Sequence, residues 1–446
     1  MSNSVITAGA VYIPGCSVKS RRGSRRVCAS DEDAVTMAVE AGSTAVQSWG
    51  RLPQAVDALI VALRQSEARV DYGANAHIVR EALGLPDDVR LVVLSGTDEL
   101  SGVEALQAAG SDTALVIASD EGTAGGSSAG AAALIVEPST AATGGLNWRQ
   151  LCRASSLTHR NWAGSDNGRE PDARFLAHRD RGLLERLGAT AGDGLHEVSR
   201  LIVAAGAAGK LPVAGLLGLE RLGVVADSIA MGVAGPLAAI VRVGLKHRPR
   251  SVTAICATGS GRAVLLTVDA NAGQYERFSW MSAPETGAPS ASYGQGPELP
   301  LPLESPFYSR DWAFTLRLEA ARCMMCGYLA FPPAQRPVCP KCRSREWSSV
   351  PLPREGAVFA CTENRFLPEG FPPALVFVLA ELSNGVKYWA PMPPEIRGDQ
   401  IRIGDPVRLA LRCFTIRSGI AAYAMKFVKS STVEADQDVN TAATYH

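Results

Sequence analysis

Four cysteines in the last third of the chain have the spacing of a metal site. Two residues separate Cys323 from Cys326, two separate Cys339 from Cys342, and twelve lie between the pairs. Two such turns direct four thiolates at one point, which is the tetrahedral arrangement that zinc prefers. Four protein ligands leave no open coordination position, so the pattern predicts a structural zinc rather than a catalytic one. The alternative is four free or disulfide-bonded cysteines, but a C-x-x-C redox pair would not need a second pair at matched spacing.

Length and charge limit the classes of function. The chain has 446 residues, which is enough for two or three domains with separate cores. Its 44 basic and 44 acidic residues balance, so binding to nucleic acid through phosphate charge is not expected. The longest apolar stretches, such as 229–241 with Pro236 inside, are too short to span a membrane. The polar first residues and the scattered other cysteines predict a protein of the reducing cytoplasm.

Residues 5–137 alternate strand-like and helix-like patterns, which predicts a layered α/β unit. A second segment repeats this rhythm, and two α/β halves in tandem indicate an internally duplicated fold. Strands are expected in the first half at 5–13, 58–63, 91–94, 114–119 and 131–136, and the last two are expected to be buried because of their continuous apolar character. In the second half the expected elements are strands at 201–205, 251–257 and 263–268 and a helix at 227–243.

The clearest helix pattern of the first half covers residues 31–49. Ser30 is the expected N-cap, and Asp31, Glu32 and Asp33 fall in the first turn. Carboxylates in a first turn are stabilised by the positive end of the helix dipole. The sequence therefore predicts an amphipathic helix whose acidic residues serve its own N-terminus.

The rest of the chain divides into four parts. Residues 271–310 are rich in Pro, Gly and Ser, which predicts a linker. The cysteine pairs lie in 311–349. Five short strands joined by turns predict a small barrel of OB type over 350–430, with strands at 356–362, 374–382, 386–390, 406–414 and 419–427. The polar tail, 431–446, is expected to be disordered.

The cysteine pairs, Phe331-Pro332-Pro333 and the stretch IGDPV at 403–407 carry a resemblance to a known family. Over about residues 311–428 the chain resembles the zinc-ribbon and OB-fold proteins that accompany thiolases and are often described as acyl-CoA-binding. The resemblance implies a rubredoxin-like zinc ribbon at 311–349, followed by the OB barrel. It also implies that this part joins a thiolase-fold partner and helps to form its acyl-CoA tunnel.

The N-terminal part carries a second resemblance, in DEDAVTMAVEA at 31–41, ALGLP at 82–86, SGVEAL at 101–106, ALVIASD at 114–120 and GSG at 259–261. On these stretches it resembles the hydroxymethylglutaryl-CoA synthase branch of the thiolase superfamily. The resemblance implies a duplicated thiolase-like fold of α/β/α/β/α layers over 1–270, with halves at about 1–145 and 146–270. It also implies a homodimer. The whole chain thus resembles a fusion of two proteins that are ordinarily separate partners.

The residues that carry the chemistry of this family are replaced. The family uses a cysteine nucleophile at a helix N-terminus together with a histidine and an asparagine. The resemblance places Glu99 at the cysteine position, Ala204 at the histidine position and Met231 at the asparagine position. The general-acid glutamate of the family would fall near Ser66, with Glu67 one position away. We therefore expect that Cys-His-Asn chemistry is lost.

Two residues remain candidates for catalysis. Glu99, with Asp98 beside it, is a candidate general base in a changed mechanism. The alternative is a carboxylate that caps a helix or pairs with a cation. Cys256, just before Gly259, is a candidate second reactive cysteine, and the alternative is a buried residue that fills a strand.

Two hypotheses about function follow. In the first, the chain is a degenerate binding or partner subunit of an acyl-transfer or C–C bond-forming pathway. It would bind acyl-CoA or an acyl-carrier thioester and act with an active thiolase-family partner or an acyl carrier protein. In the second, it is an active acyltransferase or synthase that uses Glu99. The replaced residues favour the first hypothesis, with zinc as the expected structural cofactor and with neither nucleic acid nor a membrane as a partner.

Overall fold

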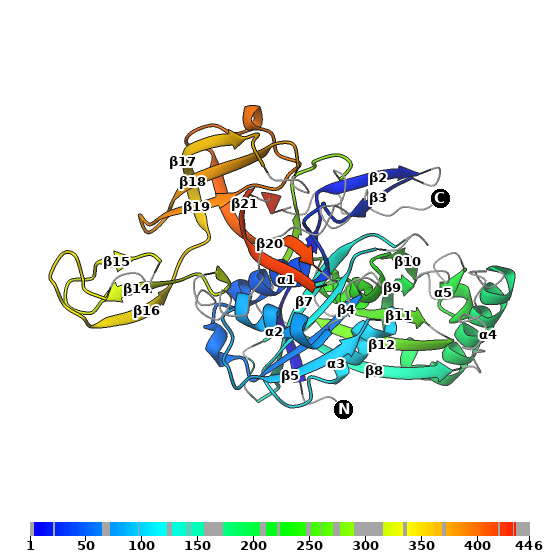
Figure 1. The fold of residues 1–446 in the computed structure, drawn as a ribbon. Coiled ribbons are helices and arrows are strands. Elements are labelled where there is room, and N and C mark those ends of the chain that lie inside the picture. Colours follow the sequence, from blue (N-terminus) through cyan, green and yellow to red (C-terminus); the bar gives the residue numbers. More distant parts are fainter. Residues whose placement is uncertain are drawn as a thin grey trace.

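The computed structural model contains a large α/β unit and two smaller β units (Figure 1). The predictions for the linker and the tail fall largely outside the residues that the structure describes, and Ser66 and Glu67 lie outside them as well. The described residues are 4–20, 23–64, 72–96, 98–122, 127–140, 142, 144–155, 173–205, 211–220, 224–246, 251–259, 261–270, 277–289, 315–332, 337–367, 372–417, 420–430 and 432–433.

The two halves of the α/β unit have the same strand order. The first half runs β5–β4–β6–β7–β1 and the second runs β10–β9–β11–β12–β8, so that both are 3-2-4-5-1 when counted along the chain. The halves meet where Ile6 pairs with Leu146. The strands are β1 (Ser4–Ile13), β4 (Ala58–Arg64), β5 (Arg90–Ser95), β6 (Ala114–Asp120), β7 (Gly130–Pro138), β8 (Leu146–Ser155), β9 (Val198–Ala205), β10 (Val225–Ser228), β11 (Val252–Gly259) and β12 (Arg262–Ala270).

Helices cover the outer faces of the two halves and also lie between the halves. In each of these places an apolar core fills the space between the helices and the strands. Helices α1 (Ala34–Trp49) and α2 (Tyr72–Ala82) pack on the first half. Helices α3 (Leu100–Gln107) and α6 (Gly235–Leu245) share the core that contains residues of both halves. Helices α4 (Ala173–Ala191) and α5 (Val213–Leu216) pack on the second half. Among the helices that the structure describes, none has the length and apolar character needed to cross a lipid bilayer.

Two smaller β units follow the α/β unit, and Figure 1 shows the first projecting to one side and the second lying above α1. The first, which we call the cysteine unit, has strand order β15–β14–β16, and the second, which we call the C-terminal sheet, has order β19–β18–β17–β20–β21. Their strands are β14 (Glu319–Cys323), β15 (Leu329–Ala330), β16 (Trp347–Pro351), β17 (Glu355–Asn364), β18 (Leu375–Leu382), β19 (Lys387–Pro391), β20 (Pro406–Arg417) and β21 (Ile420–Lys429).

The beginning of α1 differs from the prediction. The N-cap is Asp33, not Ser30, because the side chain of Asp33 accepts a hydrogen bond from the Thr36 backbone N–H at 2.9 Å and Thr36 Oγ1 accepts one from the Asp33 N–H. This reciprocal pair is a capping box. Asp31 and Glu32 lie outside the helix and are buried, so they do not act as first-turn residues.

The other differences concern strands held by distant partners. Asp227, predicted at the start of a helix, lies in β10, and α6 begins at Gly235 after a short 3-10 turn. Strand β13 (Phe278–Ser282) falls within the predicted linker, where it pairs parallel with β1. Strand β22 (Thr432–Val433) falls in the predicted tail and pairs with β13. The hairpin of β2 (Cys16–Ser20) and β3 (Gly23–Val27) was not predicted.

Candidate functional site

Positions that the resemblance singles out gather at one end of the strands of the α/β unit. Strands β4 and β6 are parallel and both end there, at Arg64 and Asp120. An added Cβ on Gly259, the last residue of β11, would lie 2.6 Å from Asp98 Cγ. Such close approach requires glycine at this position. Residues of both halves therefore meet at this end of the strands, at the beginning of α3.

Glu99 immediately precedes α3, but its side chain makes no capping hydrogen bond. Asp98 holds the helix start instead, because its Oδ1 accepts a hydrogen bond from the Leu100 N–H at 3.0 Å. Burial raises the pKa of Glu99, and the neighbouring carboxylates of Asp98 and Asp120 raise it further, while Arg64 lowers it. The structure thus places Glu99 among like charges, where a proton is held more firmly than on an exposed carboxyl.

Asp120 fills the space beside Met231. Its Oδ2 accepts a hydrogen bond from the Val233 N–H at 3.0 Å, and its Oδ1 accepts one from the Gly122 N–H at 2.8 Å. Gly232 has a φ of +50°, and an added Cβ there would lie 1.9 Å from Asp120 Oδ2. Asp120 therefore fixes the turn before α6. Met231 is 4% exposed and belongs to the core between the halves.

Ala204 and Cys256 are both buried in the second half. Ala204 lies in β9, where its Cβ would be 3.5 Å from a Cβ added to Gly235 at the start of α6. Cys256 lies in β11, and its side chain belongs to the outer core with α4, whereas its neighbours Ile255 and Ala257 belong to the core with α3. Burial, with a smaller contribution from the Cys152 thiol, raises the pKa of Cys256 to about 12. Cys256 is thus on the other face of the sheet from Glu99, in a protonated form that is a poor nucleophile.

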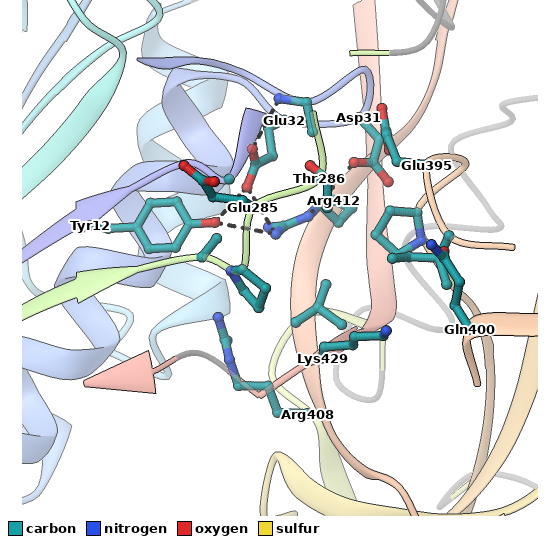
Figure 2. Close-up of a pocket in the computed structure, with 17 residues that line it drawn as sticks. Tyr12, Asp31, Glu32, Glu285, Thr286, Glu395, Gln400, Arg408, Arg412 and Lys429 are labelled. Carbon is teal, nitrogen blue, oxygen red and sulfur yellow. Dashed lines mark hydrogen bonds and ion pairs between the residues drawn. The ribbon is translucent and has the colours of Figure 1, made fainter. Parts of the chain in front are cut away.

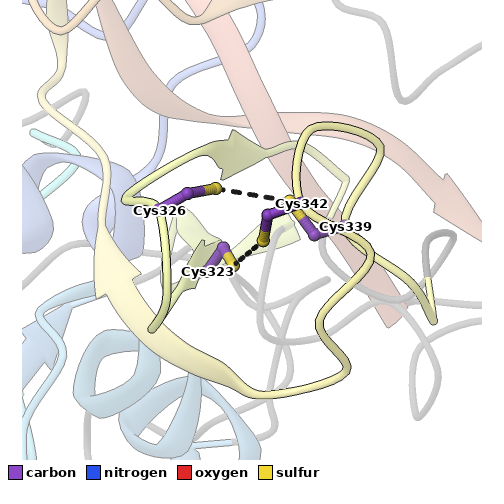
Figure 3. Close-up of side chains that lie close together, drawn as sticks. All are labelled: Cys323, Cys326, Cys339 and Cys342. Atoms are coloured by element: carbon purple, nitrogen blue, oxygen red, sulfur yellow. Dashed lines mark hydrogen bonds between the residues drawn. The ribbon is translucent and has the colours of Figure 1, made fainter.

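The structure brings all four predicted metal ligands together (Figure 3). The sulfur atoms of Cys323, Cys326, Cys339 and Cys342 lie within 4.8 Å of one another. The Sγ atoms of Cys323 and Cys342 are 3.5 Å apart, and those of Cys326 and Cys339 are 3.6 Å apart. Zinc–sulfur bonds of about 2.3 Å put the sulfurs of a tetrahedron about 3.8 Å apart. The cluster therefore has the dimensions of a tetrathiolate zinc site.

The two cysteine turns have the same hydrogen-bond pattern. The Cys323 N–H donates to the Tyr328 carbonyl and the Gly327 N–H donates back to Cys323, and the second turn repeats this from Cys339 to Arg343. Gly327 has a φ of +73° and Arg343, at the matching position, has a φ of +63°. Burial raises the pKa of the Cys323 thiol, but the N–H groups of Cys326 and Met325 outweigh it and lower that pKa to about 6. Backbone donors thus favour the thiolate form of Cys323. At Cys342 a backbone hydrogen bond at Ser344 acts in the same direction, but burial and the three neighbouring cysteines outweigh it and raise the pKa of that thiol to about 12.

A pocket of about 230 Å³ lies where the α/β unit meets the C-terminal sheet (Figure 2). Tyr12, Asp31 and Glu32 line it from the α/β unit, and Arg408 and Arg412 line it from β20. Figure 2 shows Glu32 pointing at both Tyr12 and Arg412. Tyr12 Oη donates to Glu32 Oε1 at 2.5 Å, and Arg412 Nη2 lies 2.9 Å from the same oxygen. The pocket wall is therefore built of ion pairs that join two parts of the chain.

The sequence patterns did not predict that the arginines of β20 take part in this junction. Arg408 and Arg412 alternate along β20 with Leu409 and Leu411, which lie in the apolar core. Charges on one face of a strand and apolar residues on the other usually indicate a solvated face. The acidic run at 31–33 was a signal, however, because it contains more negative charge than the capping of one helix N-terminus requires.

No protein-family model matches the chain. Among solved structures, OleA of Xanthomonas campestris with bound lauric acid and lauroyl-CoA is 16% identical, has a TM-score of 0.51, and is aligned over 60% of this chain and 99% of that one. OleA of the same organism with bound cerulenin is 14% identical, has a TM-score of 0.50, and is aligned over 60% and 97%. These identities show the fold alone, which is a thiolase-like α/β fold.

One curated relative has detectable sequence similarity. The benzoylsuccinyl-CoA thiolase subunit BbsA of Geobacter metallireducens is 29% identical over 94 residues, which are 21% of this chain and 61% of that protein. The match thus spans less than two thirds of the relative's length.

Proposed function

We propose that the chain is an acyl-thioester-binding subunit of the thiolase superfamily that has lost Cys-His-Asn chemistry and serves an acyl-transfer or C–C bond-forming pathway. The observation that carries this proposal is the arrangement at the C-terminal ends of β4 and β6, where Glu99, Asp120 and Met231 lie together. Acyl transfer by this fold needs a thiolate and donors aimed at a developing oxyanion. The carboxylates of Glu99 and Asp120 would instead repel that charge, although Arg64 Nη1, 3.7 Å from Asp120, offsets part of the repulsion, and a methionine gives no donor. The names of BbsA and of OleA with bound lauroyl-CoA support acyl-CoA as the ligand class.

We assign the two smaller β units to the folds that the sequence resemblance implies. The cysteine unit would be a rubredoxin-like ribbon with one zinc, held by Cys323, Cys326, Cys339 and Cys342, since the spacing of the sulfurs fits. The C-terminal sheet would be an OB-type barrel, because its first strand, β17, pairs with both the second and the fourth. The boundaries at 270, 310, 349 and 430 remain predictions. The zinc would be structural, so no reaction step is assigned to it.

A test of the proposed function compares binding with turnover. We expect calorimetric titration of the purified chain with short-chain and long-chain acyl-CoAs to show saturable binding of at least one of them. The thioester concentration, followed by its absorbance, is expected to stay constant over hours. Titration with the matching free fatty acids is the control for nonspecific apolar binding. Absence of binding throughout the panel would contradict a thioester ligand, and steady hydrolysis or transfer would contradict the loss of catalysis.

We further propose that a second thiolase-like unit covers strand β5. The strands beside it in the sheet, β4 and β6, are buried almost throughout, whereas Leu91, Val92, Val93 and Leu94 of β5 are only half-buried. Among the strands that the structure describes, β5 pairs only with β4, and an apolar edge strand is a template for another strand. The second unit would come from another copy or from an active thiolase-family partner. Light scattering is expected to give about twice the 46.9 kDa mass of one chain, and a monomer at all concentrations would contradict the homodimer.

A second candidate function is acyl transfer or synthesis with Glu99 as general base. The observation in its favour is the raised pKa of Glu99, which brings a carboxyl closer to the range in which it exchanges protons near neutral pH. This candidate needs turnover in the assay above and loss of that turnover in Glu99→Gln. The acyl group could instead be delivered on an acyl carrier protein. The same titration with an acylated carrier protein tests this alternative.

A further inference from the structure

The junction between the α/β unit and the C-terminal sheet contains charges that are separated by sign. Most of the carboxylates come from residues 31–40, before and within the first part of α1, and the cations come from residues 354–426. The exception is Glu395 of the C-terminal part, which accepts a hydrogen bond from the Ser30 N–H at 3.0 Å. We call the main set the interdomain ion network; it consists of Asp31, Glu32, Asp33 and Glu40 on one side and Arg354, Arg408, Arg412 and Lys426 on the other. Three of its carboxylates thus face cations, and the fourth, Asp33, faces a tyrosine hydroxyl.

The contacts within the network are short and buried. Lys426 Nζ lies 2.7 Å from Asp31 Oδ2, and the two side chains are 1% and 0% exposed. Arg408 Nη2 lies 2.5 Å from Glu40 Oε2. Asp33, which already caps α1, also accepts a hydrogen bond from Tyr423 Oη of β21 at 2.7 Å.

Backbone contacts and electrostatics agree with this pairing. The Cys413 N–H donates to the Asp31 carbonyl at 2.9 Å, so the main chains of the two units also touch. Burial alone would raise the pKa of Glu40, but Arg408, Arg412 and Arg354 hold it below its usual value. Leu409 and Leu411 of β20 are buried on the strand face opposite the arginines. The contacts of β20 with the segment 31–40 are therefore largely ionic and directional.

We infer that the interdomain ion network is the determinant that docks the C-terminal sheet on the α/β unit of its own chain, in one orientation. Buried ion pairs add little net stability, because desolvation offsets most of their attraction. A shifted orientation, however, would leave several charges buried without partners, which costs several kcal/mol for each. The network therefore excludes other orientations more than it stabilises the correct one.

Chain continuity supports docking within one chain. After β21 the chain returns to the α/β unit, where Val433 of β22 pairs with Met281 of β13, and β13 pairs with β1. The docked sheet also completes the pocket next to the C-terminal end of β1. In this arrangement the C-terminal sheet closes a pocket on its own chain and leaves the rest of the α/β surface, including β5, for a partner. This inference goes beyond the proposed function and stands whether or not the chain binds a thioester.

The test uses the full chain and the pair Asp31–Lys426. We expect Asp31→Leu and Lys426→Met each to lower the melting temperature by about 5–10 °C, because each removes the group that lies 2.7 Å from a buried charge. The Cys413 amide is expected to exchange its hydrogen at least about tenfold faster in each, since opening of the junction frees it. The double variant Asp31→Leu/Lys426→Met is expected to recover most of both losses. Glu363→Leu/Arg365→Met, at an ion pair whose arginine is 73% exposed and which lies outside both the network and β5, is the matched control and should change the melting temperature by less than about 2 °C.

Mixing separates docking within a chain from exchange between chains. If the C-terminal sheets were exchanged between two copies, mixing Asp31→Leu chains with Lys426→Met chains would create one neutral and one native junction, and the melting temperature would recover. We expect the mixture, refolded together, to show only the two lowered transitions. Recovery on mixing would overturn docking within the chain. Single variants that melt like the parent, or a double variant whose loss is the sum of the two single losses, would overturn the network as the docking determinant.

Discussion

Replacing one ligand of the four-cysteine cluster is expected to release its metal and unfold the cysteine unit. We expect the purified chain to hold one zinc and Cys339→Ser to hold well under one. Structural zinc contributes an apparent binding free energy of about 10–16 kcal/mol in small domains at neutral pH. Over its described residues the cysteine unit has three short strands, and we expect its core to be too small to fold without that contribution. Elemental analysis of the zinc content and protease digestion of the cysteine unit measure the two effects.

The chain offers a matched control for this substitution. Cys361 is exposed on β17, outside the four-cysteine cluster, so Cys361→Ser should keep the zinc and the protease resistance of the parent. Cys339 is buried at the start of its turn, where its N–H donates to the Ser344 carbonyl. Both variants lose one thiol, and only Cys339→Ser removes a member of the cluster. Cys339→Ser with full zinc content and parental stability would contradict the structural site.

The parts of the structure that the sequence predicts well are those that local patterns determine. The five strands of the C-terminal sheet and the strands of the first half were predicted close to their observed bounds, because each is an apolar stretch between turn residues. The cysteine cluster was predicted for the same reason, since two short turns fix the directions of all four thiolates. In both cases the information lies within a few residues of the element.

The predictions were wrong where contacts between segments far apart in the sequence determine the local structure. Asp31 and Glu32 follow the rule for a helix N-terminus, but Lys426 and Arg412, almost 400 residues later, bind them more strongly than a helix dipole does. Phe278, Trp280 and Met281 are buried in β13, yet the surrounding Gly, Pro and Ser favoured a linker over this range. Pairing with β1 and β22 was invisible from the local composition. The positions at which the resemblance implies replaced catalytic residues, in contrast, could be named from the sequence, and their replacement stays a prediction.

Incubation with acyl-CoA is expected to leave the mass of the α/β unit unchanged. A covalent acyl-enzyme needs a thiolate with a base or a helix dipole beside it. The sequence resemblance places Glu99 at the nucleophile position, and Cys256 is buried, with a pKa of about 12, on the other face of the sheet. Intact-mass measurement after exposure to a panel of acyl-CoAs checks this result. Cys256→Ser should behave like the parent, since a protonated, buried thiol contributes nothing to acyl transfer.

Two outcomes of this experiment would change the proposed function. A stable adduct that maps to the α/β unit and disappears in Cys256→Ser would make Cys256 a nucleophile and overturn the binding-subunit proposal. Turnover without an adduct would leave Glu99 as the candidate base, and Glu99→Gln then decides, because glutamine keeps the size of the side chain and removes its proton exchange. Loss of turnover by about 100-fold or more would identify a catalytic carboxylate. Retained turnover would show that the chemistry occurs at another site, since Asp98 and not Glu99 holds the start of α3 and the substitution leaves that helix cap intact.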